Sequence, residues 1–130
     1  MKVDCSTIIK IGEKMSEEFI VEEKDTADYL GNKGVTVLST PAMIYYMERT
    51  ASSVVFERAP ENYRPVGTRI DVRHINPTPV GGRITVNAAV KAVDGNKVTY
   101  DVEAFYGDVK IGYGEYEIHV IDLNRFKSKL

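Results

Sequence analysis

One long amphipathic helix pattern, followed only by strand patterns, is the feature that most constrains this fold. Residues 41 to about 56 are predicted to be helical, because Pro41 stands where its missing N–H costs nothing and Thr40 offers a capping hydroxyl. Stepping about 100° per residue gathers six apolar side chains within about 120°: Met43, Ile44, Met47, Ala51, Val54 and Val55. The positions outside this stripe are Tyr45, Arg49 and Ser52. The stripe predicts a helix with one face on a core.

From Thr68 onward the hydrophobic period changes to the alternation of β-strands. Four such segments follow, at about 68–74, 84–91, 98–104 and 109–120. Asp94-Gly95 and Gly107-Asp108 are typical of tight turns between strands. The buried parity changes around Gly112 to Gly114, which predicts a β-bulge there.

An earlier segment, Met15 to Glu23, alternates apolar and charged residues and is predicted to be an edge strand. One strand, one helix and four further strands define an α+β protein with a long antiparallel sheet around a single central helix. We assign residues 1–130 to one domain, with residues 1–14 as an irregular extension. Because a helix of about 24 Å is shorter than most of these strands, the sheet must curl around it. The exposed edges that remain predict a homodimer and leave a tetramer open.

Composition excludes several classes of function. Seventeen basic and nineteen acidic side chains give a net charge of -2 without a basic cluster, which argues against nucleic acid or a membrane surface as partner. No apolar run approaches the roughly twenty residues that span a bilayer. A single cysteine, Cys5, and two histidines predict neither an internal disulfide nor a metal cluster. These features are typical of a cytoplasmic protein.

Three polar residues are candidates for chemistry. His74 continues the inward series of Thr68, Ile70 and Val72, so it should face the helix, partly desolvated and poised to exchange a proton. Glu48 lies at the margin of the apolar stripe and could act as a general base in a cleft. Thr40 stands where the positive end of the helix dipole favours developing negative charge. Taken singly, each has a structural alternative: a core histidine, a solvated glutamate and a simple cap.

Gly67 and His119 lie in or beside the predicted strands and have less specific patterns. Gly67, just before the strand, indicates either a close backbone approach or a loop. His119 falls on the more polar parity of the last strand and is predicted to be exposed. With no phosphate-binding loop, nucleophile elbow or metal motif in the sequence, Thr40, Glu48 and His74 form the one candidate constellation.

Several motifs, in chain order, carry a resemblance to a known family: VLSTPAMI at 37–44, Met47-Glu48, Gly67-Thr68, His74, PTPVG at 77–81, Val93-Asp94-Gly95, and Lys110-Ile111-Gly112 with Gly114. Together they resemble the fluoroacetyl-CoA thioesterase-like branch of the hotdog-fold superfamily. The resemblance covers residues from about 15 to 126. One departure stands out, because the branch often has a Gly-x-His-x-Arg pattern where this chain reads Gly114-Glu115-Tyr116-Glu117-Ile118. The acyl preference of the branch is therefore not carried over.

The resemblance implies a hotdog fold and a dimer with an acyl-CoA site at its interface. It implies an acyl-CoA thioesterase that hydrolyses a small acyl thioester, with coenzyme A as part of the substrate and no metal or other cofactor. Thr40, Glu48 and His74 fall at the family's catalytic positions, and Gly67 falls beside the substrate pocket. Covalent acyl-threonine formation and direct attack by water both stay open. The alternatives are a noncatalytic acyl-CoA-binding module and, on weaker grounds, an enoyl-CoA hydratase.

Overall fold

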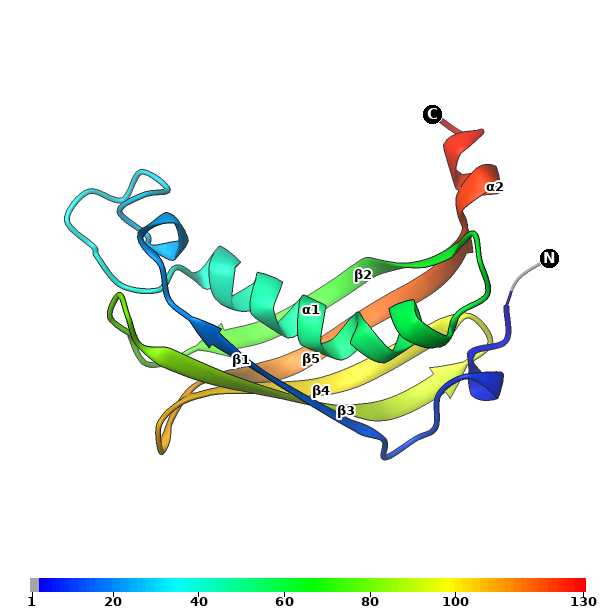
Figure 1. Cartoon of the computed structure of the whole chain (residues 1–130), viewed down its shortest axis with the longest axis horizontal. Helices are drawn as coiled ribbons and strands as arrows, with labels where there is room; N and C mark the ends of the chain where they lie inside the picture. The colour runs from blue at the N-terminus through cyan, green and yellow to red at the C-terminus, as the bar shows by residue number, and fades with distance from the viewer. Residues whose placement is uncertain (1–2) are drawn as a thin grey trace.

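A five-stranded antiparallel sheet curls around one long helix in the computed structural model, which describes residues 3–130 (Figure 1). The sheet order is β1-β3-β4-β5-β2. The main elements are β1 (Lys14–Ile20), α1 (Thr40–Arg58), β2 (Tyr63–His74), β3 (Arg83–Asp94), β4 (Lys97–Tyr106) and β5 (Val109–Asp122). This is the predicted α+β architecture, and the helix lies across the concave face of the sheet.

The two predicted tight turns are confirmed. Gly95 joins β3 to β4 at φ 61°, and Gly107 joins β4 to β5 at φ 58°. Only glycine adopts this left-handed backbone without a steric cost. These hairpins place β3, β4 and β5 side by side in the centre of the sheet. The segment near Met15 is an edge strand, as predicted, because β1 pairs with β3 alone.

The start of α1 differs from the prediction in one respect. Ser39, not Thr40, is the N-cap, and its hydroxyl accepts a hydrogen bond of 3.2 Å from the Ala42 amide. Thr40 is therefore the first helical residue and its hydroxyl is released from capping. Ser39 can cap because its extended backbone (φ -77°, ψ 154°) turns its side chain back over the first turn.

The buried face of α1 differs from the predicted stripe, because Ile44 and Val54 are only partly buried while Tyr46, Thr50 and Ser52 are buried. Seven of its residues are buried: Met43, Tyr46, Met47, Thr50, Ala51, Ser52 and Val55. Ser52 was expected to face outward, so that expectation is wrong. Because the sheet curls, it contacts more than one side of the helix. The buried Ser52 hydroxyl donates a hydrogen bond of 2.7 Å to the backbone carbonyl of Glu48.

Irregularities in the strands alter which residues face the helix. The predicted bulge in β5 exists but lies at Ile111, because Ala104 pairs with Gly112 and Phe105 with Lys110. A second, unpredicted bulge lies at Thr68 in β2. Thr68 therefore faces outward, where its hydroxyl lies 2.7 Å from Glu117 and 2.8 Å from the Nδ1 of His119, instead of continuing the inward series. This contact leaves His119 only partly exposed, against the prediction.

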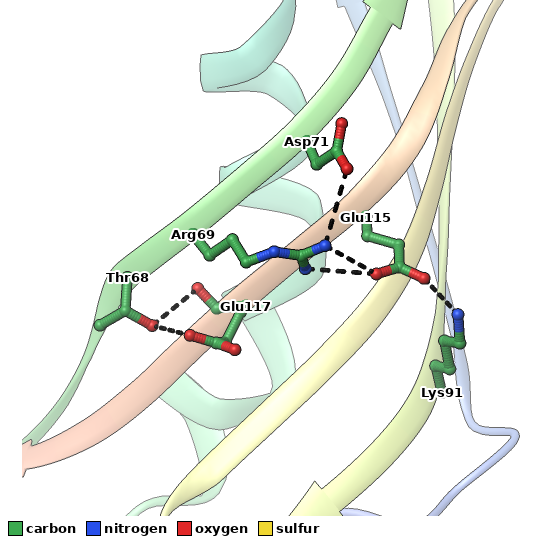
Figure 2. Close-up of polar contacts among 6 residues, drawn as sticks. All are labelled: Thr68, Arg69, Asp71, Lys91, Glu115 and Glu117. Atoms are coloured by element: carbon green, nitrogen blue, oxygen red, sulfur yellow. Dashed lines mark hydrogen bonds and ion pairs between the residues drawn. The ribbon is translucent and has the colours of Figure 1, made fainter.

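The outer face of the sheet carries a charged network across β2, β5 and β3 (Figure 2). Arg69 lies 3.2 Å from Glu115 and 3.6 Å from Asp71, and Lys91 binds the other oxygen of Glu115. Water screens such exposed pairs, so they add little stability. They keep charge on the solvent side of the strands while the inner side stays apolar.

The shorter elements pack at the ends of the sheet: η1 (Cys5–Thr7), η2 (Glu23–Asp25) and α2 (Leu123–Lys127). Within the extension expected over residues 1–14, positions 1 and 2 lie outside the described residues. The Cys5 amide donates to the Gly95 carbonyl at 2.8 Å, and its free thiol is buried, which raises the pKa of that thiol. No helix in residues 3–130 is long and apolar enough to cross a membrane.

Candidate active site

Thr40 and His74 meet where α1 begins and β2 ends. The Thr40 hydroxyl lies 2.9 Å from the Nδ1 of His74, whose side chain faces the helix as predicted. The neighbouring strand explains the approach, because His74 pairs with Gly112, which has no side chain. A Cβ at Gly112 would lie 2.8 Å from the Cε of Met43, so the first turn of α1 packs into that space. The glycine thereby brings the helix start onto the sheet.

The surroundings of His74 keep its ring neutral near pH 7. Burial lowers the pKa of His74, and an interaction with the backbone of Asn76 opposes this only in part. In the tautomer with an unprotonated Nδ1, the neutral ring accepts the Thr40 hydroxyl proton; in the other tautomer Nδ1–H donates to the hydroxyl oxygen. The ring Nε2 is buried and has no hydrogen-bond partner among residues 3–130. The first tautomer combines an available base with a hydroxyl already hydrogen-bonded to it.

Glu48 lies two turns further along α1, partly buried at the base of a groove of about 610 Å³. The groove is lined by Glu17, Tyr45, Glu48, Arg49, Ser52, Ser53, Phe56, Pro65, Gly67 and Tyr116. A Cβ at Gly67 would lie only 2.9 Å from the Oε2 of Glu48 and 2.9 Å from the Tyr116 hydroxyl. Gly67 is thus a point of close approach between β2 and the two polar groups. Of the two interpretations from the sequence, a close backbone approach and a loop, the structure shows the first.

Tyr116 is the residue of this groove that sequence reasoning missed. It is 4% exposed, and its hydroxyl lies close to the Glu48 carboxylate, because a Cβ at Gly67 would lie 2.9 Å from both groups. Burial, the charge of Glu48 and hydrogen bonding to that carboxylate all raise the pKa of Tyr116, so its phenol stays protonated. The available signal was a phenol on the apolar parity of the last strand, in line with Ile118 and Val120. Such a position is most often core, and only the contact with Glu48 distinguishes it.

The candidate residues fall into two groups within one chain. Thr40 contacts His74, and Glu48 contacts Tyr116 beside Gly67. Eight residues separate Thr40 from Glu48, which corresponds to about 12 Å along the helix axis. One copy of the chain therefore does not bring all three sequence-predicted residues together. In the part of the chain that the structure describes, no three His, Cys, Asp or Glu side chains cluster as a metal site would require.

A long antiparallel sheet wrapped around one central helix defines the hotdog class of proteins, and here a Thr–His pair lies at the helix start. The model of the family described as fluoroacetyl-CoA-specific thioesterase matches residues 21–124. The chain belongs to that family, which is one of thioester hydrolases acting on acyl-CoA.

Individual relatives agree with this assignment. The fluoroacetyl-CoA thioesterase of Streptantibioticus cattleyicolor is 28% identical over 128 residues, covering 94% of this chain and 92% of that protein. A crystal structure of a fluoroacetyl-CoA-specific thioesterase variant with fluoroacetate and CoA is 28% identical with a TM-score of 0.87, covering 91% of this chain and 99% of that one. A hot-dog-like protein from Thermanaerovibrio acidaminovorans matches with a TM-score of 0.89 at 22% identity, over 98% and 94% of the two chains. This last match shows the fold alone.

Proposed function

We propose that this chain hydrolyses a small acyl-CoA thioester to the free acid and CoA, using Thr40, His74 and Glu48. The observation that carries the proposal is the 2.9 Å hydrogen bond between the Thr40 hydroxyl and a His74 ring kept neutral by burial. The site needs no cofactor besides the CoA part of its substrate. We place this activity in the cytoplasm, where CoA esters are found. The free Cys5 thiol is consistent with that reducing compartment.

The reaction joins an oxygen to the thioester carbonyl and breaks its C–S bond. His74 or Glu48 takes the proton from the attacking hydroxyl, which belongs to Thr40 or to a water that Thr40 orients. The carbonyl oxygen gains negative charge as the tetrahedral intermediate forms, and the positive end of the α1 dipole offsets that charge. The proton taken from the nucleophile then goes to the departing CoA thiolate, directly from His74 or, where Glu48 took it, by way of His74. If Thr40 attacks, a water later cleaves the acyl-threonine ester by the same steps.

We further propose that the working unit is a homodimer whose second copy completes the site. β2 is an edge strand of twelve residues, so its outer side is free to pair with β2 of a second copy. Tyr45 and Phe56, beside the Glu48 groove, are 55% and 59% exposed and would be covered there. An antiparallel pairing of two chains sets the start of one α1 against the middle of the other. The Thr40–His74 pair then faces Glu48 of the partner subunit across the interface.

The experiment that tests the function measures release of free CoA thiol from acetyl, short branched, aromatic and long-chain acyl-CoA esters. We expect turnover of a small ester, and a loss of about 100-fold or more in His74→Ala and in Glu48→Gln, with both variants folded by circular dichroism. Turnover in either variant equal to wild type removes that residue from the mechanism. Saturable acyl-CoA binding without any turnover overturns the proposal in favour of a noncatalytic binding module.

A further inference from the structure

The Tyr116 phenol is a buried polar group at the site to which the proposed mechanism gives no part. Its side chain projects from the middle of β5 towards α1, is 4% exposed and ends on the Glu48 carboxylate. A tyrosine needed only for packing could be phenylalanine. Its hydroxyl is therefore the part that calls for an explanation.

The strands around Tyr116 hold its ring firmly. On the inner face it pairs with Tyr100 of β4, and the two rings stack with centroids 6.2 Å apart. On the outer face both of its neighbours in β5 are bound to β2: Glu115 by Arg69 and Glu117 by Thr68 (Figure 2). The polar network of the outer face thus anchors the residues on either side of Tyr116. A ring anchored from both faces presents its hydroxyl at a fixed position.

Glu48, in contrast, has a long side chain with several rotatable bonds and borders an open groove. Its Oε2 lies beside Gly67 in the small space between β2 and the Tyr116 hydroxyl, a space that a Cβ would fill. A hydrogen bond from a neutral donor to a carboxylate is among the stronger protein hydrogen bonds. The contact with Tyr116 therefore selects one orientation of Glu48 from those that the groove would permit.

We propose that Tyr116 is a positioning residue of this enzyme, whose hydroxyl holds the Glu48 carboxylate against Gly67 in its working orientation. This inference rests on the proposed function, because the orientation matters for catalysis only if Glu48 takes part in hydrolysis. Tyr116 itself does not touch the reacting atoms and exchanges no proton in the reaction.

The test compares Tyr116→Phe with Tyr100→Phe on the best ester of the thiol-release panel. Tyr100 is a matched control, because its phenol is buried in the same stack and its hydroxyl has no hydrogen-bond partner in residues 3–130. We expect Tyr116→Phe to lower kcat about tenfold or more at unchanged KM, and Tyr100→Phe to keep the kcat of wild type. Equal kcat in wild type and both variants overturns the proposal.

A second readout does not depend on turnover. Carboxylate-detected ¹³C NMR resolves the Glu48 signal, which is identified by its absence from Glu48→Gln. We expect that signal to move towards those of solvent-exposed glutamates in Tyr116→Phe and to stay in place in Tyr100→Phe. If wild type cleaves no ester but the Glu48 signal still moves in Tyr116→Phe, the proposed hydrolysis is wrong and the positioning of Glu48 by Tyr116 is supported. A signal that stays in place in Tyr116→Phe overturns the hold itself.

Discussion

The start and the middle of α1 carry two different kinds of polar site. At the start, Thr40 and His74 form a hydrogen-bonded pair within one chain, with a partly buried ring kept neutral. In the middle, Glu48 is held by Tyr116 beside Gly67 and opens onto a groove. The first region already combines a base and a hydroxyl, whereas the second supplies a fixed charge beside a groove that no residue from 3 to 130 closes.

The contrast teaches that proximity in sequence does not make a catalytic constellation. The two regions share a helix, yet about 12 Å along its axis separates their functional groups. Rotation of a side chain cannot close such a gap. A second copy, packed along the β2 edge, provides the missing approach in the proposed enzyme.

Complementation between inactive variants tests whether the two regions act across an interface. His74→Ala and Glu48→Gln are each expected to be nearly inactive alone. When the two are unfolded together and refolded as a mixture, random pairing makes one intact site in each heterodimer, and about a quarter of wild-type turnover returns. Turnover of the mixture that stays at the level of the separate variants would sink the shared site.

Thr40 and Ser39 separate chemistry from capping at the start of the helix. Thr40→Ala removes the hydroxyl bonded to His74 and is expected to lower kcat about 100-fold, while Thr40→Ser keeps most of it. Because Ser39 provides the cap, Ser39→Ala is the control: it costs about 1 kcal/mol of unfolding free energy but spares kcat. Steady-state kinetics and urea unfolding measure both effects, and a Thr40→Ala enzyme with wild-type kcat contradicts a role for this hydroxyl.

Gly67→Ala disturbs the middle region alone. The new Cβ would lie 2.9 Å from both Glu48 Oε2 and the Tyr116 hydroxyl, so the hydrogen-bonded pair must shift. We expect kcat to fall about tenfold with a stability loss of about 1 kcal/mol. Gly82→Ala is a matched control, because its Cβ would crowd Thr78 at 2.6 Å, away from Glu48. Similar kcat values for the two alanine variants would show that the Glu48–Tyr116 contact does not require a glycine at position 67.

The pH dependence of stability reports on the start of the helix. Burial lowers the pKa of His74 below its ordinary value of 6.5, so the unfolded chain binds this proton more readily than the folded chain. The unfolding free energy should therefore fall modestly as the pH decreases from about 6.5 through the folded pKa. Urea unfolding should show this loss in wild type and in His119→Gln, and a smaller one in His74→Gln. An identical loss in all three proteins would assign it to other groups.

Much of the fold could be predicted because its signals are local. The Asp94-Gly95 and Gly107 turns, the apolar stripe of α1 and the alternation of the later strands each depend on neighbours a few residues away. The wrong predictions also concern single residues, but their causes lie in the pairing and curvature of the sheet. Thr68 faces outward because of a bulge in the pairing of β2 with β5, and Ser52 is buried because the sheet curls past it. Neither event leaves a mark in the sequence around the residue.

The candidate site was predicted in its residue types and only partly in its contacts. The inward parity of His74 led correctly to its place opposite the helix start. The role of Thr40 as cap was wrong, because either hydroxyl of Ser39-Thr40 fits the capping pattern and backbone geometry chose Ser39. Tyr116 was missed, since a phenol on an apolar parity is indistinguishable from core until its partner is known.

Periodicity, turn residues and motifs are properties of the chain read in order, so they suffice to predict the elements, their order, the turns between them and the family. Which polar groups meet depends instead on the folded chain. Gly112 admits Met43 and so draws Thr40 to His74, and Gly67 leaves the space in which Glu48 reaches Tyr116. Those contacts depend on β-bulges, on the curvature of the sheet and on glycines in neighbouring strands. These features set distances in space that cannot be read from the spacing of residues along the chain.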